Sequence, residues 1–305
     1  MLQVTTDKRN FAPAKDGRTT AARRRGKTMK KILLINDVVG YGRVGMAAMM
    51  PVLTYLGHPV YLLPTALVSN TLDYGRFAVQ ETTDYMTRVL PVWHELGFSF
   101  DALCTGLMFS EEQARVVARY AEEQARRGVK VFVDPVMGDG GRLYNGITEE
   151  TIRLERRMIA TAHLVFPNYT EACLLAGTDY CEQGLASAND AVALATRLHQ
   201  MGARSVLITS ARVQGRPAVV GYNDDSGEHF VEYYEEVPAA FHGTGDVFSA
   251  IVIGQLMLGK MLRPSTRHAM DAVQQMIARY AGKEPDLKGG LPIEHCLDLI
   301  GVHSS

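Results

Sequence analysis

The residues best suited to do chemistry lie in the segment Phe241-His242-Gly243-Thr244-Gly245-Asp246, which leads into a run of small and apolar residues. Glycines and a threonine before a helix leave backbone N–H groups accessible and without hydrogen-bond partners. Together with the helix dipole, these groups favour the binding of an anion. Such a site stabilises the charge that develops on a transferring phosphoryl group. Asp246, in the first helical turn, is expected to stay ionised and to accept the proton of a substrate hydroxyl. The alternative interpretation is that Asp246 only caps a helix, so other segments must decide between the two.

Small polar or acidic residues also follow several predicted strands. They are Asp37, Thr65, Asp134, Asn168 and the pair Thr209-Ser210, with Glu171 close behind Asn168. In an open α/β sheet, ligands bind beyond the carboxyl ends of the strands. Polar residues at strand ends are common in such folds, but the acidic pair Asp134 and Glu171 strengthens the prediction of one ligand-binding edge.

The elements that must position these residues alternate between short apolar runs and amphipathic stretches of helical length. Strands are predicted at residues 31–36, 59–63, 102–107, 129–134, 163–167 and 205–209, and helices at 45–56, 76–96, 111–127, 149–160, 169–176, 186–201, 244–258 and 264–281. Residues 216–223 and 228–237 are predicted to form an antiparallel hairpin. The alternation is typical of repeated βαβ units. The expected fold class is therefore α/β, with a mostly parallel central sheet and helices on both faces.

The composition excludes several other classes of protein. A chain of 305 residues with 47% hydrophobic residues can bury a substantial core without crosslinks. The four cysteines show no C-x-x-C spacing, which argues against a zinc site and favours a cytoplasmic location. No apolar run approaches the roughly 18 residues that a membrane span requires.

The first 28 residues differ from the rest of the chain. They hold eight Lys or Arg residues against two Asp residues, and few large apolar side chains. We interpret residues 1–28 as a disordered basic leader and residues 29–305 as a single domain. Binding of nucleic acid by the leader is the less favoured alternative.

One motif misleads. Residues 40–45 read Gly-Tyr-Gly-Arg-Val-Gly, which formally matches the dinucleotide-binding fingerprint. That mechanism needs an acidic residue about 20 positions further on to hold a ribose hydroxyl. No Asp or Glu occurs between Asp37 and Asp73. We therefore reject a dinucleotide site, although bare backbone here still allows close approach of a ring or a phosphate.

Taken in order, several segments resemble the ribokinase superfamily and, within it, the pyridoxal kinases. Residues 241–250 resemble the closing signature of the superfamily, whose last Asp is the catalytic base. Residues 134–139, Asp-Pro-Val-Met-Gly-Asp, resemble a D-P-V-[ML]-G-D loop, and residues 168–171, Asn-Tyr-Thr-Glu, resemble an N-x-x-E motif. Residues 39–45 resemble V-V-Y-G-H-V-G, and Thr65 with Ser69-Asn70 and Tyr74-Gly75 resembles a substrate loop.

The resemblance implies a ribokinase-like three-layer sandwich that phosphorylates the 5′-hydroxymethyl group of pyridoxal, pyridoxine or pyridoxamine with ATP and Mg²⁺. It also implies a homodimer and a monovalent cation such as K⁺. The implied roles are a catalytic base for Asp246; an anion hole for Gly243, Thr244 and Gly245; magnesium binding for Asp134 and Glu171; ATP binding for Asp139, Tyr144, Asn168, Thr209 and Ser210; and contact with the pyridine ring for Asp37, Gly42 and Thr65. Residues 138–146 would form a flap over the phosphates.

Two departures from the family pattern keep other substrates open. Asp37 stands where the family usually has Ser, and Arg43 and Met46 replace a His and an Asn. The alternatives are a hydroxymethylpyrimidine kinase or a sugar kinase of the same superfamily. From a different class, the chain could be a non-catalytic vitamin or nucleotide sensor. His242, beside the glycine turn, is left without a role.

Overall fold

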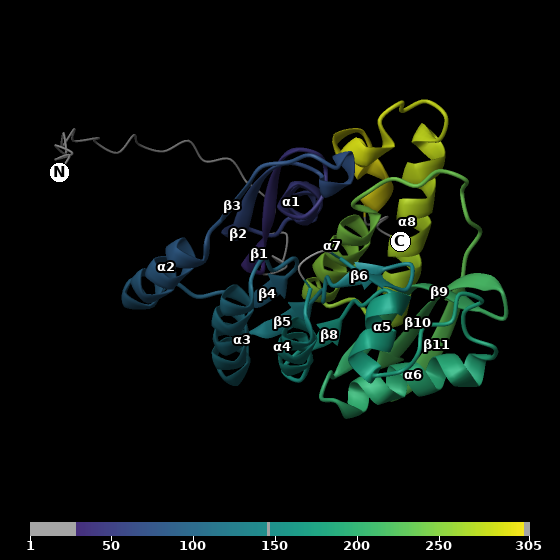
Figure 1. Cartoon of the computed structure of the whole chain (residues 1–305), viewed down its shortest axis with the longest axis horizontal. Coiled ribbons are helices and arrows are strands. Elements are labelled where there is room, and N and C mark those ends of the chain that lie inside the picture. The colour runs from purple at the N-terminus through teal and green to yellow at the C-terminus, as the bar shows by residue number, and fades with distance from the viewer. Residues whose placement is uncertain (1–28, 145–146, 302–305) are drawn as a thin grey trace, which may run out of the picture.

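The β-branched and apolar runs of the sequence form one nine-stranded sheet in the computed structural model, which describes residues 29–144 and 147–301 (Figure 1). The strand order is β11-β10-β9-β8-β5-β4-β1-β2-β3. The bounds are β1 Ile32–Tyr41, β2 Val60–Asn70, β3 Val79–Glu81, β4 Ala102–Thr105, β5 Lys130–Val133, β8 Leu164–Val165, β9 Ser205–Val213, β10 Arg216–Asn223 and β11 Glu228–Tyr233. The six strands from β9 to β2 are parallel, and β3, β10 and β11 are antiparallel to their neighbours. The predicted leader, residues 1–28, lies outside the described residues.

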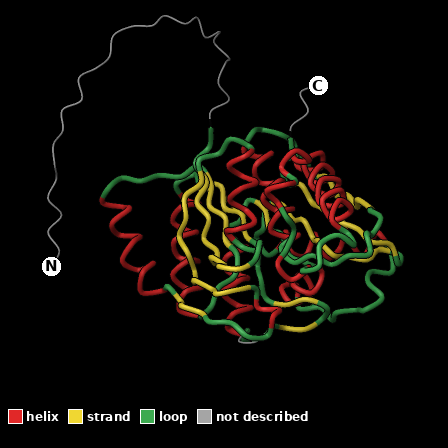
Figure 2. Tube along the Cα trace, turned by 90° about the horizontal axis from the view of Figure 1, so that it is seen from above, coloured by secondary structure: helices red, strands yellow, loops and turns green. Residues whose placement is uncertain are grey.

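Helices cover both faces of this sheet, as the fold class predicted (Figures 1 and 2). Successive side chains of a strand point to opposite faces. Leu33 and Ile35 of β1 therefore pack with one set of helices, and Ile32 and Leu34 pack with the other. The first set is α2 Thr83–Glu95, α3 Glu111–Arg126, α4 Glu149–Ile159, α5 Tyr169–Ala176 and α6 Ala188–Gln200; the second is α1 Met46–Tyr55, α7 Thr244–Met257 and α8 Leu262–Tyr280.

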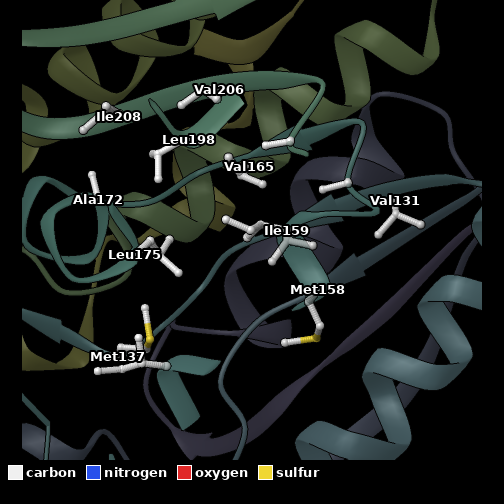
Figure 3. Close-up of a cluster of buried hydrophobic side chains, with 14 of the residues drawn as sticks. Val131, Met137, Met158, Ile159, Val165, Ala172, Leu175, Leu198, Val206 and Ile208 are labelled. Carbon is white, nitrogen blue, oxygen red and sulfur yellow. The ribbon is translucent and has the colours of Figure 1, made fainter. Parts of the chain in front are cut away.

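The core between the sheet and the first set of helices is continuous and apolar. Figure 3 shows part of it, where Val131 of β5, Val165 of β8 and Ile208 of β9 belong to one cluster with Ile159 of α4 and Leu175 of α5. Each fully buried Val, Ile or Leu side chain contributes about 1.5–3 kcal/mol relative to an exposed one. The rigid sheet that results fixes the positions of the loops at its carboxyl edge.

Among the described helices, none combines the length and the apolar composition that crossing a bilayer requires.

Three strands, β1, β2 and β9, run further than the sequence predicted, and one predicted helix is shorter. β1 and β2 continue beside each other to the pair Tyr41 and Asn70, whereas the prediction ended them at residues 36 and 63. Residues 79–81, predicted as helix, pair antiparallel with β2 before α2 begins at Thr83. Propensity favoured a helix there, but pairing with an available strand edge overrides local preference.

Two of the predicted strand ends are instead β-bulges inside longer strands. Opposite Asp37 of β1, the partner strand β2 contributes two residues, Thr65 and Ala66. In β9, Thr209 and Ser210 lie together opposite a single residue of β10, Val219. A bulge leaves residues out of the regular pairing and redirects their side chains. The polar residues at these two places are therefore positioned by irregular pairing and not by the ends of strands.

The turn from β1 into α1 depends on Gly45. Its φ of 56° lies in the left-handed region, which glycine adopts without strain. A Cβ atom at this position would lie only 2.3 Å from Oδ1 of Asp37 and 2.8 Å from the Asp37 carbonyl oxygen. Asp37 thus packs directly on the bare Cα of Gly45, so the turn has no room for a side chain.

We predict that Gly45→Ala destabilises the protein by about 2–4 kcal/mol, because backbone strain and overpacking against Asp37 add together. Urea unfolding followed by circular dichroism measures the effect. The control is Gly57→Ala at the other end of α1, where φ is 91° but nothing lies within 4 Å of an added Cβ. That variant should lose only about 1–2 kcal/mol, and equal losses for the two variants would contradict the role of the Asp37 contact.

Candidate active site

Three loops that are distant in the sequence meet at the carboxyl edge of the sheet. They are residues 42–45 after β1, residues 242–246 at the start of α7, and residues 286–290 near the end of the chain. The Gly45 N–H donates to Oδ2 of Asp246 at 2.9 Å, and the Arg43 N–H donates to the Gly289 carbonyl at 2.9 Å. A Cβ on Gly243 would lie 2.2 Å from the Arg43 carbonyl oxygen. The predicted phosphoryl-transfer segment therefore packs against the β1–α1 turn.

The start of α7 has the geometry of an anion site. Its N-cap residue, Gly243, has φ 75°, and no side chain caps the first turn. Gly245 is exposed, and a Cβ there would meet nothing within 4 Å. Uncapped N–H groups at a helix N-terminus point toward solvent and favour negative charge. Gly243, Thr244 and Gly245 thus form an uncapped helix start, which is the local geometry that the predicted anion hole requires.

Asp246 faces this turn from the first turn of α7 and is partly buried. Burial raises the pKa of its carboxyl to about 6, while the hydrogen bond from the Gly45 N–H and the nearby amide of Asn36 oppose that rise. A carboxyl with this pKa is mostly ionised at neutral pH and holds a proton more tightly than an ordinary aspartate. It is therefore well suited to act as a general base.

A second carboxyl lies on the other side of Gly45. Asp37 is 7% exposed, and burial followed by the nearby charge of Asp246 raises its pKa to about 7. Its own backbone N–H opposes this rise. Since two carboxylates at one turn resist joint ionisation, the pair favours a ligand that brings a proton donor or a positive charge.

Asn36, which the sequence analysis did not single out, supports both acids. The residue is 3% exposed, and its Oδ1 accepts the N–H groups of Asp37 at 2.9 Å and Leu107 at 3.0 Å. These bonds tie the irregular part of β1 to the loop after β4. A lone amide in the apolar run of β1 was the available signal, because a buried polar side chain usually has a specific set of partners.

The acidic pair Asp134 and Glu171 lies on neighbouring elements, after β5 and in the first turn of α5. Glu171 is 3% exposed and accepts the N–H groups of Met137 at 3.0 Å and Asn168 at 2.8 Å. Asn168 in turn caps α5 by accepting the Glu171 N–H at 3.0 Å, which completes a capping box. The motif is thus a rigid helix start that fixes one carboxylate.

Burial raises the pKa of Glu171 to about 8, although its N–H donors oppose the rise. Burial also raises the pKa of Asp134 well above its usual value, and the charges of Glu171 and Asp246 raise it further. Carboxylate oxygens are the ligands that Mg²⁺ prefers, and it typically takes one or two of them together with water and phosphate oxygens. Asp134 and Glu171 fit that donor set. In residues 29–144 and 147–301, no group of three or more His, Cys, Asp or Glu side chains could hold a metal ion by itself.

The residues predicted to bind ATP lie next to this pair. β6 Gly138–Asp139 and β7 Arg142–Leu143 form a small two-stranded sheet, and the Asn168 side chain donates to the Gly138 carbonyl at 2.8 Å. Asp139 and Tyr144 are exposed there. Residues 145–146 of the predicted flap lie outside the described residues.

Thr209 of the β9 bulge forms a bridge with Asn168, which brings the bulge beside the start of α5. The next residue, Ser210, has φ 52°, an uncommon backbone conformation for a residue with a side chain. Such strain often accompanies functional sites.

Gly42 and Thr65, predicted to face the substrate ring, have different surroundings. Gly42 lines a cavity of about 410 Å³ together with Tyr41, Arg43, Glu284 and Asp286. Thr65 is fully buried, and its carbonyl oxygen accepts bonds from the Thr82 N–H and the Gln113 side chain. Thr65 therefore offers no exposed surface to a ligand. The contribution of residues 284–290 to the cavity was missed, because it carries no recognisable motif.

Comparison with known proteins gives the family. Residues 62–290 match the family model described as phosphomethylpyrimidine kinase. The pyridoxine/pyridoxal/pyridoxamine kinase of Bordetella avium is 32% identical over 270 residues, which cover 81% of this chain and 84% of the relative.

Solved structures agree with this result. A Bacteroides thetaiotaomicron protein assigned to the phosphomethylpyrimidine kinases, in a crystal form with pyridoxal, superposes with a TM-score of 0.84 at 30% identity, covering 90% of this chain and 96% of that one. Pyridoxal kinase from Leishmania donovani, in complex with ADP and pyridoxamine, gives a TM-score of 0.77 at 25% identity, covering 90% and 97%. The chain therefore belongs to the phosphomethylpyrimidine kinase family, which it shares with pyridoxal kinases of the ribokinase superfamily, and it is a phosphotransferase that acts on a hydroxyl group.

Proposed function

We propose that this protein transfers the γ-phosphoryl group of ATP to the 5′-hydroxymethyl group of pyridoxal, pyridoxine or pyridoxamine. The observation that carries the proposal is the Asp246 carboxyl, held by the Gly45 N–H beside an uncapped helix start. The names of the relatives supply the substrate class, since the Bordetella avium enzyme acts on these three vitamers and the Leishmania donovani enzyme binds ADP.

The chain's own residues account for the chemistry of the transfer. Asp246 accepts the proton of the substrate hydroxyl as the oxygen attacks phosphorus. The N–H groups at Gly243, Thr244 and Gly245 stabilise the negative charge that develops on the transferring group. Because these donors are fixed by the helix, they need no reorganisation when the charge appears.

Nucleotide and metal bind beside this helix in the proposal. Asn168, Thr209 and Ser210 contact the phosphates, while Asp139 and Tyr144 lie on the hairpin that covers them. Asp134 and Glu171 hold Mg²⁺, which when bound neutralises phosphate charge and favours departure of ADP. From the family resemblance we further propose that K⁺ supports activity, that two copies form a homodimer, and that the enzyme is cytoplasmic.

Asp37 gives the ring its orientation in this proposal. Among the described residues, no side chain donates a hydrogen bond to its carboxyl, and its backbone N–H is bonded to Oδ1 of Asn36, so the carboxyl is free to pair with a protonated ring nitrogen or a phenolic hydroxyl. Gly42 leaves space for the flat ring on the cavity wall. The family model is named for a pyrimidine substrate, so a hydroxymethylpyrimidine is the second candidate.

The substrate class is tested by offering the purified protein Mg-ATP with pyridoxal, pyridoxine, pyridoxamine, hydroxymethylpyrimidine or ribose. Phosphorylation is followed by the increase in product mass. At least one of the three vitamers should exceed the pyrimidine and the sugar in kcat/KM by about tenfold or more, since Asp37 is matched to a ring donor. A preference for the pyrimidine would favour the second candidate, and no product from any of the five alcohols would contradict the proposal.

The base is tested by Asp246→Asn, which keeps the shape of the side chain but cannot accept a proton. We expect kcat to fall about 10²- to 10⁴-fold, the usual range for loss of a general base. The matched control is Asp84→Asn, because Asp84 is an exposed acid in the first turn of another helix, α2. Turnover by Asp246→Asn within a few-fold of the control would remove Asp246 from the mechanism.

The pH dependence follows from the same carboxyl. The pKa of Asp246 is about 6 and that of Asp37 about 7, and a base works only above its pKa, where it is ionised. For a given substrate, kcat/KM should therefore be highest above pH 7 and fall as the pH drops through about 7 and about 6. Asp37→Asn should abolish the step near 7 and keep the step near 6. A rate that stays constant down to about pH 5 would contradict the assignment, because Asp246 is then mostly protonated.

A further inference from the structure

The side chain of Arg43 is held by an acid from the other end of the described chain. Its Nε donates to Oε2 of Glu294 at 3.0 Å, and its Nη2 donates to Oε1 at 2.6 Å. Two parallel bonds of this kind make an arginine–carboxylate contact both strong and directional. The hydrogen bond from Arg43 lowers the pKa of Glu294, so the acid is ionised at neutral pH. The chemistry described above makes no use of this pair.

The main chain of Arg43 is fixed as well. Its N–H donates to the Gly289 carbonyl at 2.9 Å. Its own carbonyl oxygen lies between two glycines, since a Cβ atom would be 2.2 Å from it on Gly243 and 2.9 Å from it on Gly290. Only bare backbone fits on either side. The β1–α1 turn, the start of α7 and residues 289–290 therefore pack together around the peptide group of Arg43.

Glu294 itself sits on a firm base. It lies in the short helix η3 Ile293–His295. Its neighbours Ile293 and Cys296 are buried in the apolar cluster that packs α1, α7 and α8 against the sheet. An acid between such neighbours has little freedom to move. Its carboxylate is therefore a fixed anchor for the Arg43 guanidinium.

This anchor lies close to the reacting groups along the chain. Two residues after Arg43, the Gly45 N–H donates to Oδ2 of Asp246 at 2.9 Å. Gly243, which packs on the Arg43 carbonyl, is the N-cap of the uncapped helix start. A displacement of Arg43 would thus move the donor to Asp246 and the first residue of the proposed anion hole together. A misplacement of about 1 Å in an active site can cost about 10²-fold in rate.

A surface ion pair without a function is the simpler interpretation. The exposed fractions of the Arg43 and Glu294 side chains are 38% and 52%, and most exposed pairs contribute little to stability. A second pair allows a comparison. Arg279 and Asp298 form the same two-bond contact at 2.7 and 2.8 Å, but they join α8 to the short helix η4 Leu297–Ile300, only 19 residues apart. Glu294 differs from Asp298 in that its partner belongs to the turn beside Asp246.

We propose that Glu294 is a positioning residue of the phosphoryl transfer, which acts through Arg43 to hold the β1–α1 turn against the start of α7. In this role Glu294 touches neither substrate nor nucleotide. It fixes the placement of the Gly45 N–H on Asp246 and of the helix start at Gly243. The inference rests on the proposed function, in which Asp246 is the base and this helix start is the anion hole.

The test is steady-state kinetics of Glu294→Ala in the full chain, with Mg-ATP and the vitamer that the wild-type protein phosphorylates fastest. We expect kcat to fall about tenfold, because the base and the anion hole lose their common support. The KM for ATP should stay within about twofold of wild type, since the contact acts on the transition state and the proposed nucleotide residues lie on other elements.

The matched control is Asp298→Ala, which breaks the corresponding contact with Arg279 and should keep kcat within about twofold of wild type. The unfolding midpoints of the two variants should fall by similar small amounts, because each loses one exposed ion pair. A kinetic loss in Glu294→Ala alone therefore cannot come from lower stability.

A double-mutant cycle tests the route through Arg43. Arg43→Ala should lower kcat at least as much as Glu294→Ala, and the double variant should be no slower than Arg43→Ala, because both changes break one contact. Losses that multiply in the double variant would mean that Glu294 does not act through Arg43, and would overturn the inference. If Glu294→Ala does not fold, Glu294→Gln, which loses the charge, replaces it and must still lower kcat by about threefold or more.

The two levels of the proposal fail in different ways. Normal turnover by wild type, with equal kcat values for Glu294→Ala and Asp298→Ala, would overturn the role of Glu294 and leave the proposed function intact. Absence of turnover by the wild-type protein would contradict the proposed function and this inference together.

Discussion

A set of buried carboxyl groups without basic partners among the described residues is the constraint on which this site depends. The carboxyl groups of Asp37, Asp134, Glu171 and Asp246 gather at one edge of the sheet, and each has a pKa raised first by burial. Within residues 29–144 and 147–301, the nearby Arg43 pairs with Glu294 and not with any of these four. Such a cluster persists only because apolar cores on both faces of the sheet hold its elements in place. Its charge is balanced when cationic or proton-donating ligands arrive.

Much of the fold and part of the site follow from sequence patterns. Alternating apolar runs and amphipathic stretches predict a sheet covered on both faces, because each element must bury one face. The glycines before Asp246 and the spacing of Asn168 and Glu171 predict local helix starts, since capping depends on neighbours in sequence. Both kinds of pattern are short-range, and the structure places them as expected.

What the sequence did not reveal depends on contacts between distant segments. The bulges at Asp37 and at Thr209 arise from the register of neighbouring strands, which no single strand specifies. Thr65 matched a family motif, yet its strand continues and buries it completely. Asn36 was visible as a polar residue in an apolar run, but one of its partners, the Leu107 N–H, comes from the loop after β4.

The cavity beside Gly42 is assembled from segments near both ends of the described part of the chain. Tyr41 donates a hydrogen bond to Asp286, 245 residues later, and the Arg43 side chain pairs with Glu294. During synthesis on the ribosome, the early strands can pair long before the last wall of this cavity exists. A small molecule that occupies the cavity therefore cannot assist the first stages of folding. It can only stabilise a chain whose translation is nearly complete, by binding the native state in preference to the unfolded one.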